Sequence, residues 1–290
     1  MLCLPPFMRY IDEPFNSQTG ITEIPQNFLY IPEDSDSADR AYRPVFNDLL
    51  AGKSHFRSSL LPQRDQSVAK QLARRLLHSR TALAYQRDSR DPRKTRPVIK
   101  DPLACFSAAY LHHRLGYDTV IIVRHPASTI ASFKRLGWHF SLKEIGGQSE
   151  LVRRHLEGLL PTADQNTLTP VQGWSYVWLA IYKALSDFAD TYPDMIVVLH
   201  TELSRNPDTT FAGLYEKLRL PYSDDFRTAV RNHTSAQNPA DAPTGVAHAL
   251  KRDSAQAMTS WKRILEPKEV DEIRELTRSV SDRYFDSSDW

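Results

Sequence analysis

The chain has 290 residues, of which 41% are hydrophobic and 25% are charged, and its formal net charge is +2 at pH 7. This composition is typical of a globular protein and predicts one large α/β domain over residues 1–290. Because the net charge is so small, the charge of the whole chain does not indicate what kind of molecule the protein binds. Cys3 and Cys105 are too few and too far apart for a disulfide framework, which predicts a reducing, cytoplasmic compartment.

Membrane insertion and secretion are not expected from the sequence. No run of eighteen apolar residues occurs, so no transmembrane helix is predicted. Residues 1–6 lack the basic start and the long apolar run of a signal peptide.

The N-terminal part predicts a short strand, a long loop and a basic helix. Residues 8–11 are expected to form a strand that ends before Pro14. Residues 17–62 are rich in Pro, Asp and Ser with weak periodicity, which predicts a long loop with short helical pieces near an acceptor site. Residues 67–85 carry apolar side chains at helical spacing, with Lys and Arg between them.

The basic character extends over residues 64–100, where eleven Lys or Arg stand against three Asp or Glu. Such a surface suits an anionic acceptor, for example a sulfated or carboxylated glycan. Nucleic acid is disfavoured because Tyr85 is the one aromatic residue there that could stack on a base. A merely solvated helix face is the third interpretation.

The middle of the chain predicts strands that alternate with helices. A short strand starts at residues 98–99, and a helix follows over 104–115. Residues 119–123 contain four consecutive apolar residues, as expected for a strand covered on both faces of a parallel sheet. Pro126 suits the first turn of a helix that runs to about Arg135.

The C-terminal half continues the alternation. Residues 174–192 form a broad apolar stripe at helical spacing, and 195–199 predict a strand. Further helices are expected over 207–218, 246–264 and 267–280. Strands that alternate with helices in this way predict βαβ units and a parallel sheet.

Arg124 ends the strand at 119–123 and is the strongest candidate binding residue. The carboxyl ends of parallel strands are where open α/β sheets bind ligands. Ser132 follows two helical turns later, and Ser128 lies on the same helical face. An arginine beside helix-borne hydroxyls makes a phosphate site. The alternative is a buried arginine that neutralises helix ends, with serines that merely fit the helix.

The unit at 119–135 resembles the 3′-phosphate-binding element of sulfotransferases that use PAPS (3′-phosphoadenosine 5′-phosphosulfate). Three more segments resemble motifs of that family, in the same order, most closely in its carbohydrate and tyrosylprotein branches. They are residues 96–102 (RPVIKDP), residues 197–207, and residues 251–254 with Trp261.

This resemblance implies a P-loop-nucleotide-kinase-like parallel sheet with helices on both faces. It also implies an enzyme that moves a sulfonate from PAPS to a hydroxyl or amine of a glycan, peptide or small molecule. The protein would bind PAPS and its product PAP (3′-phosphoadenosine 5′-phosphate), and no metal ion is needed in this scheme.

The resemblance also implies two catalytic residues. Lys100 is the expected cation near the reacting sulfonate, and a surface lysine paired with Asp101 is the alternative. Glu13 is the expected general base, with Asp12 as the neighbour that could replace it. The plain alternative for Glu13 is a loop acid that caps the next element.

Lys251, Arg252 and Ser254 are expected to close over the nucleotide, as the matching segment of the family does. The alternative is a solvated helix face, which is the commonest role of a charge run. A metal site is not expected, since no H-E-x-x-H or C-x-x-C occurs. A serine hydrolase is not expected either, since no G-x-S-x-G occurs.

One motif of the family is missing. A loop of the Pro-Arg-Ser-Gly-Thr type, which holds the 5′-phosphosulfate, should stand some twenty residues before a segment like 10–16, and residues 1–9 do not contain it. The sequence is therefore expected to be a sulfotransferase that is N-terminally truncated relative to the family. The alternative is a degenerate, non-catalytic protein of the same fold that binds PAP, another nucleotide or a partner.

Overall fold

The structure is a computed structural model that describes residues 5–57, 80–138, 142–162, 165–239 and 253–290. Its contacts divide the chain into two compact units, Met1–Gly116 (unit 1) and Tyr117–Trp290 (unit 2). Both units combine helices with a small parallel sheet, so the expected α/β class is confirmed at that level. A single domain with one continuous P-loop-like sheet stays a prediction.

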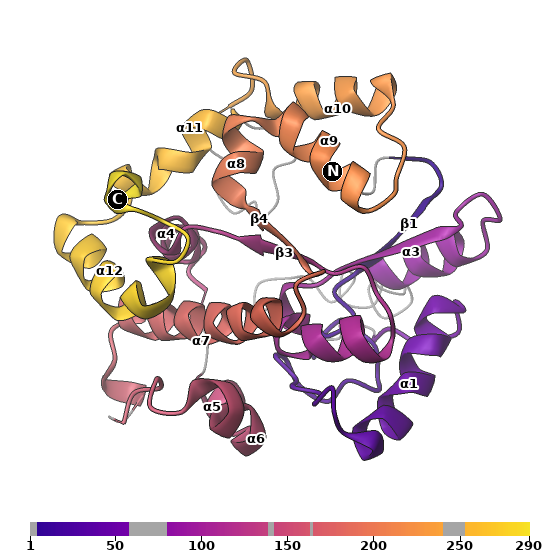
Figure 1. Ribbon diagram of the computed structural model, residues 1–290, viewed down its shortest axis with the longest axis horizontal. Helices are drawn as coiled ribbons and strands as arrows, with labels where there is room; N and C mark the ends of the chain where they lie inside the picture. The colour runs from indigo at the N-terminus through magenta and orange to yellow at the C-terminus, as the bar shows by residue number, and fades with distance from the viewer. Residues whose placement is uncertain (1–4, 58–79, 139–141, 163–164, 240–252) are drawn as a thin grey trace, which may run out of the picture. The chain divides into compact units, whose positions relative to one another are not determined.

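Unit 1 is built around one pair of strands (Figure 1). Its elements are β1 (Met8–Asp12), α1 (Asp36–Leu50), α3 (Arg80–Ser89), β2 (Arg96–Lys100), the 3₁₀ helix η1 (Pro102–Ser107) and the π-helical turn η2 (Tyr110–Arg114). β1 and β2 are parallel, with Met8 opposite Arg96 and Asp12 opposite Lys100. Both strands are therefore present where the sequence predicts them.

Helix α1 corrects the expected long loop over 17–62. The hydroxyl of Ser35 accepts a hydrogen bond from the N–H of Ala38 at 3.2 Å and so caps the helix. Pro44 lies inside the helix, where it removes one backbone donor. Phe46 and Leu49 are buried and hold the helix against unit 1.

Two other helices of unit 1 differ from expectation. Most of the helix predicted at 67–85 lies outside the described residues, and the described part, α3, continues to Ser89. The helix predicted at 104–115 is instead the 3₁₀ helix η1 followed by the π-helical turn η2. Both are helical, but they are wound more tightly and more loosely than an α-helix.

Unit 2 holds the second pair of parallel strands and most of the helices. Its elements are β3 (Val120–Val123), α4 (Pro126–Leu136), α5 (Lys143–Gly146), α6 (Ser149–Leu151), η3 (Val152–Leu156), η4 (Gln165–Thr167), α7 (Pro170–Thr191), β4 (Ile196–Leu199), α8 (His200–Arg205), α9 (Pro207–Lys217), α10 (Asp224–Thr234), α11 (Ser254–Thr259), η5 (Ser260–Arg263), α12 (Pro267–Ser281) and η6 (Ser287–Asp289).

The longest helix, α7, confirms the apolar stripe predicted at 174–192 and begins earlier. Thr169 and Gln172 form a reciprocal capping box, and Pro170 occupies the first turn. The helices predicted at 207–218 and 267–280 are α9 and α12. The helix predicted at 246–264 is only α11 and η5 within the described residues.

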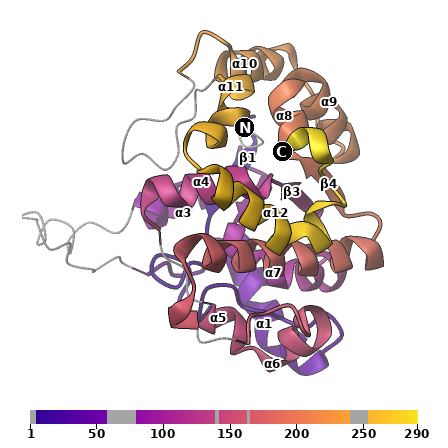
Figure 2. The same cartoon turned by 90° about the vertical axis from the view of Figure 1, so that its left-hand side faces the viewer.

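The β3–β4 pair lies between helices of unit 2, with α7 and α12 on one side and α8 and α9 on the other (Figures 1 and 2). Ile122 is nevertheless 45% exposed, and Val197 of β4 is 36% exposed. The expectation that every residue of β3 is covered on both faces is therefore wrong for Ile122. Within the described part of the chain β3 pairs with β4 alone, so its other edge lacks a neighbouring strand.

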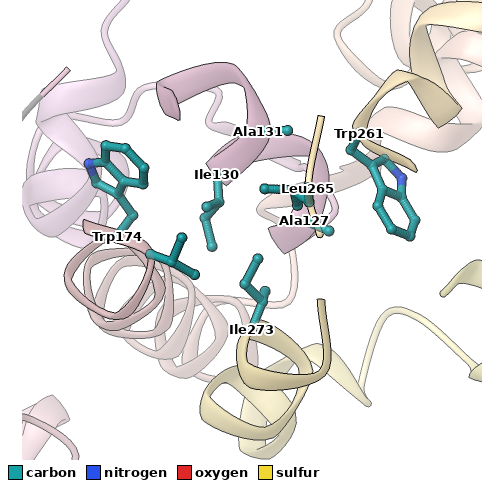
Figure 3. Packing of buried hydrophobic residues seen from close by; sticks show 8 residues of the cluster. Ala127, Ile130, Ala131, Trp174, Trp261, Leu265 and Ile273 are labelled. Atoms are coloured by element: carbon teal, nitrogen blue, oxygen red, sulfur yellow. The ribbon is translucent and has the colours of Figure 1, made fainter. Parts of the chain in front are cut away.

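The core of unit 2 positions helix α4 (Figure 3). Ala127, Ile130 and Ala131 follow one another at helical spacing and form its buried face. That face packs against α7 and α12, together with the segment between α11 and α12. The remaining buried members of the cluster are Val171, Trp174, Trp261, Leu265 and Ile273.

No helix among the described residues is long and apolar enough to cross a membrane.

Truncation of Ile273 tests this core. Ile273 is fully buried, so Ile273→Ala should lower the free energy of unfolding by about 2–5 kcal/mol through lost burial and the cavity left behind. Glu275→Ala, on the exposed face of α12, should change it by less than about 0.5 kcal/mol. Tryptophan fluorescence during urea unfolding reports unit 2, because all five tryptophans lie there: Trp138, Trp174, Trp178, Trp261 and Trp290. Equal losses in both variants would contradict the packing described.

Candidate functional site

The two predicted catalytic residues of unit 1 lie in direct contact. Lys100 Nζ is 2.5 Å from Glu13 Oε1, although the two residues are 87 positions apart. The parallel register causes this proximity: Asp12 stands opposite Lys100, and the next N–H, that of Glu13, donates to the Lys100 carbonyl at 3.0 Å. The pair thus lies at the carboxyl ends of adjacent parallel strands, a usual place for ligand sites.

Glu13 has an unusual backbone conformation. Its φ is +45°, in the left-handed region that costs a residue with a side chain about 1–2 kcal/mol. Asn16 holds the turn, because its N–H donates to the Glu13 carbonyl at 3.1 Å and its side-chain amide donates to Glu13 Oε2 at 3.2 Å. Strain of this kind is concentrated at functional sites.

Gly20 closes the loop that carries Glu13. A Cβ at this position would lie 2.3 Å from the Pro14 carbonyl oxygen and 2.6 Å from that of Asn16. The neighbouring Ile21 N–H donates to the same Pro14 carbonyl at 3.0 Å. The loop therefore returns to its own start, and only glycine fits at the point of closest approach.

Asp101 binds backbone N–H groups and is not the ion-pair partner of Lys100 that the sequence offers as an alternative. Lys100 forms its ion pair with Glu13, while the Asp101 carboxylate accepts the N–H groups of Phe15 at 2.6 Å and Leu103 at 2.8 Å. Burial, with a smaller contribution from the Glu13 charge, raises the pKa of Asp101 to about 7. Sequence reasoning considered Asp101 only as a partner of Lys100 and missed these backbone contacts, although Asp before Pro at a strand end is a helix-start signal.

Asp12, the alternative base, accepts a hydrogen bond from the Tyr10 hydroxyl at 2.7 Å. Within unit 1 the structure therefore brings Glu13, rather than Asp12, to the Lys100 ammonium. The catalytic roles of Glu13 and Lys100 stay predictions.

In unit 2, helix α7 fixes the strand end that carries Arg124. The Arg124 carbonyl accepts the Trp178 indole N–H at 3.0 Å, and the Arg124 N–H donates to the Tyr182 hydroxyl at 3.2 Å. The Tyr182 hydroxyl in turn donates to the Ile122 carbonyl at 3.0 Å. Sequence reasoning missed these hydrogen bonds, because an aromatic residue in an apolar stripe indicates only packing.

Ser128 and Ser132 lie on α4, just after this strand end. Ser128 is buried and Ser132 is half-buried. No side chain caps the first turn of α4, whose N–H groups carry the positive end of the helix dipole. The phosphate-binding role of Arg124, Ser128 and Ser132 stays a prediction.

Ser254, the third part of the predicted nucleotide site, has a structural contact. Its hydroxyl donates to the Ser204 carbonyl at 2.9 Å, and the preceding Asp253 caps α11 through the Gln256 N–H. Lys251 and Arg252 lie outside the described residues. Closure of this segment over a nucleotide stays a prediction.

His125 follows Arg124 and is sealed in an aromatic cluster. Its ring is 4% exposed and stacks on Trp261 with 5.4 Å between ring centroids. Phe285 and Trp290 contact it edge-on at 4.8 and 4.4 Å. Burial, with the nearby Lys262 charge, lowers the pKa of His125 to about 3.

No group of three or more His, Cys, Asp or Glu side chains suited to a metal ion occurs in the described parts of the two units.

Comparison with known proteins gives one similarity. The chain is similar to a solved sulfotransferase domain from the curacin biosynthetic pathway, with 15% identity, coverage of 71% of this chain and 72% of that chain, and a TM-score of 0.38. No protein-family model matches the chain. No curated protein matches it.

The strain at Glu13 predicts an unusual order of stability. Glu13→Gly should be more stable than Glu13→Ala by about 1 kcal/mol, because glycine adopts a positive φ without a Cβ penalty. At an ordinary loop position alanine is the more stable residue. Amide hydrogen exchange of the β1–β2 amides measures the effect in unit 1. If alanine is the more stable, the backbone of Glu13 is not strained.

The pKa of His125 predicts how the stability of unit 2 depends on pH. The folded-state pKa lies below the unfolded value of 6.5, so the stabilisation is complete above that pH and is lost as pH falls towards 3. The free energy of unfolding should decrease by about 1.4 kcal/mol per pH unit from this group alone.

The comparison variant is His125→Phe, which keeps an aromatic ring but cannot be protonated. Urea unfolding between pH 4 and 6, followed by tryptophan fluorescence, should show a shallower slope for the variant than for the wild type. Parallel slopes would show that His125 accepts a proton in the folded state.

Proposed function

We propose that this protein transfers a sulfonate from PAPS to a hydroxyl or amine of an acceptor. The observation that carries the proposal is the 2.5 Å contact between Lys100 and Glu13 at the carboxyl ends of adjacent parallel strands. Sulfonate transfer calls for a cation that stabilises the leaving phosphate and a base that removes the acceptor proton, and a lysine and a glutamate can supply these two functions. The order of motifs along the chain adds support.

The chemistry assigns a role to each group. The bond between sulfur and the bridging oxygen of PAPS breaks while the acceptor oxygen or nitrogen bonds to sulfur, and negative charge develops on the leaving phosphate. By analogy with phosphoryl transfer, catalysis is mainly positioning and stabilisation of that charge. The Lys100 ammonium stabilises the leaving phosphate, and Glu13 removes the acceptor proton.

The exposure of the pair supports access for substrates. The Lys100 side chain is 42% exposed and that of Glu13 is 24% exposed. In the free protein the two groups neutralise each other. Binding of an anionic donor therefore has to separate them, which leaves Lys100 to the donor and Glu13 to the acceptor.

In unit 2, Arg124, Ser128 and Ser132 are proposed to bind the 3′-phosphate. The first turn of α4 has no side-chain cap, so its N–H groups can contribute to binding an anion. Trp178 and Tyr182 support Arg124 by fixing its main chain. The main chain of Arg124 is therefore held in place by helix α7, whether or not a ligand is bound.

The acceptor is proposed only by class: a glycan, a peptide or a small molecule. The basic segment 64–100 predicts an anionic glycan as one possible acceptor. Arg87 and Arg93 are exposed in unit 1, but they form ion pairs with Asp88 and Asp91. Such pairing favours a solvated face over a glycan site for this part of the segment.

The first test is binding of PAP, measured by calorimetry. Arg124→Ala should weaken binding at least tenfold, or about 1.4 kcal/mol, because a charged hydrogen bond to phosphate is lost. Arg135→Ala is the matched control, since Arg135 is exposed in the last turn of the same helix. It should leave PAP binding unchanged. A folded chain that does not bind PAP would refute the proposed function.

The second test is transfer of radiolabelled sulfonate from PAPS to a panel of acceptors. Lys100→Met and Glu13→Gln should each lower the rate at least a hundredfold while PAP binding persists, which is the usual size of an acid–base contribution. PAP binding without any transfer by the wild type would favour the non-catalytic alternative.

A further inference from the structure

Three charged side chains gather where β1 and β2 end. Glu13 and Lys100 form an ion pair, and Asp101 is next to Lys100 in the chain. With both carboxyl groups ionised the cluster has a net charge of −1. With one carboxyl protonated it is neutral. The cluster therefore repels an anion that approaches Lys100 when both carboxyl groups are ionised, and this repulsion is removed when one of them is protonated.

We propose that Asp101 takes up a proton when Lys100 receives an oxyanion, so that anion binding at this cluster is linked to proton binding. The proton comes from solvent and adds to the Asp101 carboxylate, and no other bond is made or broken. This rests on the proposed function to the extent that Lys100 is taken as the group that receives the sulfonate or phosphate of the donor.

The geometry lets Asp101 change its charge while the site keeps its shape. One oxygen accepts the Phe15 N–H at 2.6 Å, and the other accepts the Leu103 N–H at 2.8 Å. A protonated carboxyl group retains acceptor lone pairs, so both bonds can persist. The turn after Glu13 thus stays attached to the start of η1 in both protonation states.

The surroundings of Asp101 favour this transition near neutral pH. The charged or titratable groups that act on it are Glu13 from the end of β1, Lys100 from β2 and Cys105 from η1. Burial raises the pKa of Cys105, which therefore stays neutral. Lys100 lowers the pKa of Asp101, so an anion that offsets the lysine charge raises it.

The contacts of Glu13 and Asp101 indicate which carboxyl group takes up the proton. Glu13 accepts hydrogen bonds from the Asn16 amide and from Lys100, and its side chain is partly exposed. Asp101 is instead the carboxyl group whose burial opposes a charge. A proton on Asp101 neutralises the cluster and leaves the proposed role of Glu13, removal of the acceptor proton, unchanged. Asp101 is thus a positioning residue, since it acts through Glu13 and Lys100.

The test is calorimetric titration with sodium sulfate, and separately with PAP, at pH 7 in two buffers of different ionisation enthalpy. The difference in heat gives the number of protons taken up. The wild type should take up a measurable fraction of a proton per anion, with about 0.5 as the upper limit, because a group with a pKa near 7 is already half protonated before binding. A heat that does not depend on the buffer would overturn the proposal.

Two variants separate Asp101 from the other carboxylates. Asp101→Asn should bind sulfate with no proton uptake. Asp12→Asn, which changes the carboxylate at the end of β1 that is hydrogen-bonded to Tyr10, should keep the uptake. Uptake that persists in Asp101→Asn would assign the proton elsewhere. If Asp101→Asn does not fold, carbon-13 titration of the wild-type Asp101 carboxyl should show its pKa rise on addition of sulfate, and an unchanged pKa would refute the linkage.

The two ligands distinguish this inference from the proposed function. Sulfate binding with proton uptake, but no PAP binding, would sustain the linkage and refute the nucleotide site. PAP binding without proton uptake would support the nucleotide site and refute the linkage. Failure of both anions to bind the folded chain would overturn both.

Discussion

The parallel pairing of β1 with β2 is the constraint on which the candidate chemistry depends. Backbone hydrogen bonds place Asp12 opposite Lys100, and one further bond, from the Glu13 N–H to the Lys100 carbonyl, extends the pairing past the end of β1. The chain then turns at Glu13 with a positive φ, so that its carboxylate faces the lysine that ends the neighbouring strand. A shift of register by one residue would turn these side chains to opposite faces.

In unit 2 a strand end is also held in place by hydrogen bonds from another segment, but here side chains make them. The end of β3 is held by the side chains of Trp178 and Tyr182, which occupy backbone groups of Arg124 and Ile122. Their hydrogen bonds satisfy polar atoms that the two-stranded sheet leaves unpaired. In both units the candidate functional residue therefore stands at a strand end that is fixed from elsewhere in the chain. Strand ends held in this way are suitable places for the anion-binding residues proposed above.

The sequence predicted elements where the pattern of apolar residues is regular. The apolar stripe predicted over 174–192 is present as α7, and the strand predicted over 195–199 is present as β4. For residues 17–62 the Pro-, Asp- and Ser-rich composition predicts a long loop with short helical pieces, whereas burial of Phe46 and Leu49 stabilises the longer helix α1 there. Prediction also failed for the coverage of Ile122, because a local run of apolar residues cannot show how many strands lie beside it.

The residue types of the candidate site were determined by the sequence alone: a lysine and an arginine at strand ends, a glutamate before a proline, and serines at helical spacing. These residue types and their spacing can be read from the order of residues along the chain. The partners were decided by the tertiary structure. Lys100 pairs with Glu13 rather than with its neighbour Asp101, and Asp101 binds the backbone of Phe15. Such choices depend on which segments meet in space. Burial in the folded chain then raises the pKa of Asp101, and no local sequence pattern contains that information.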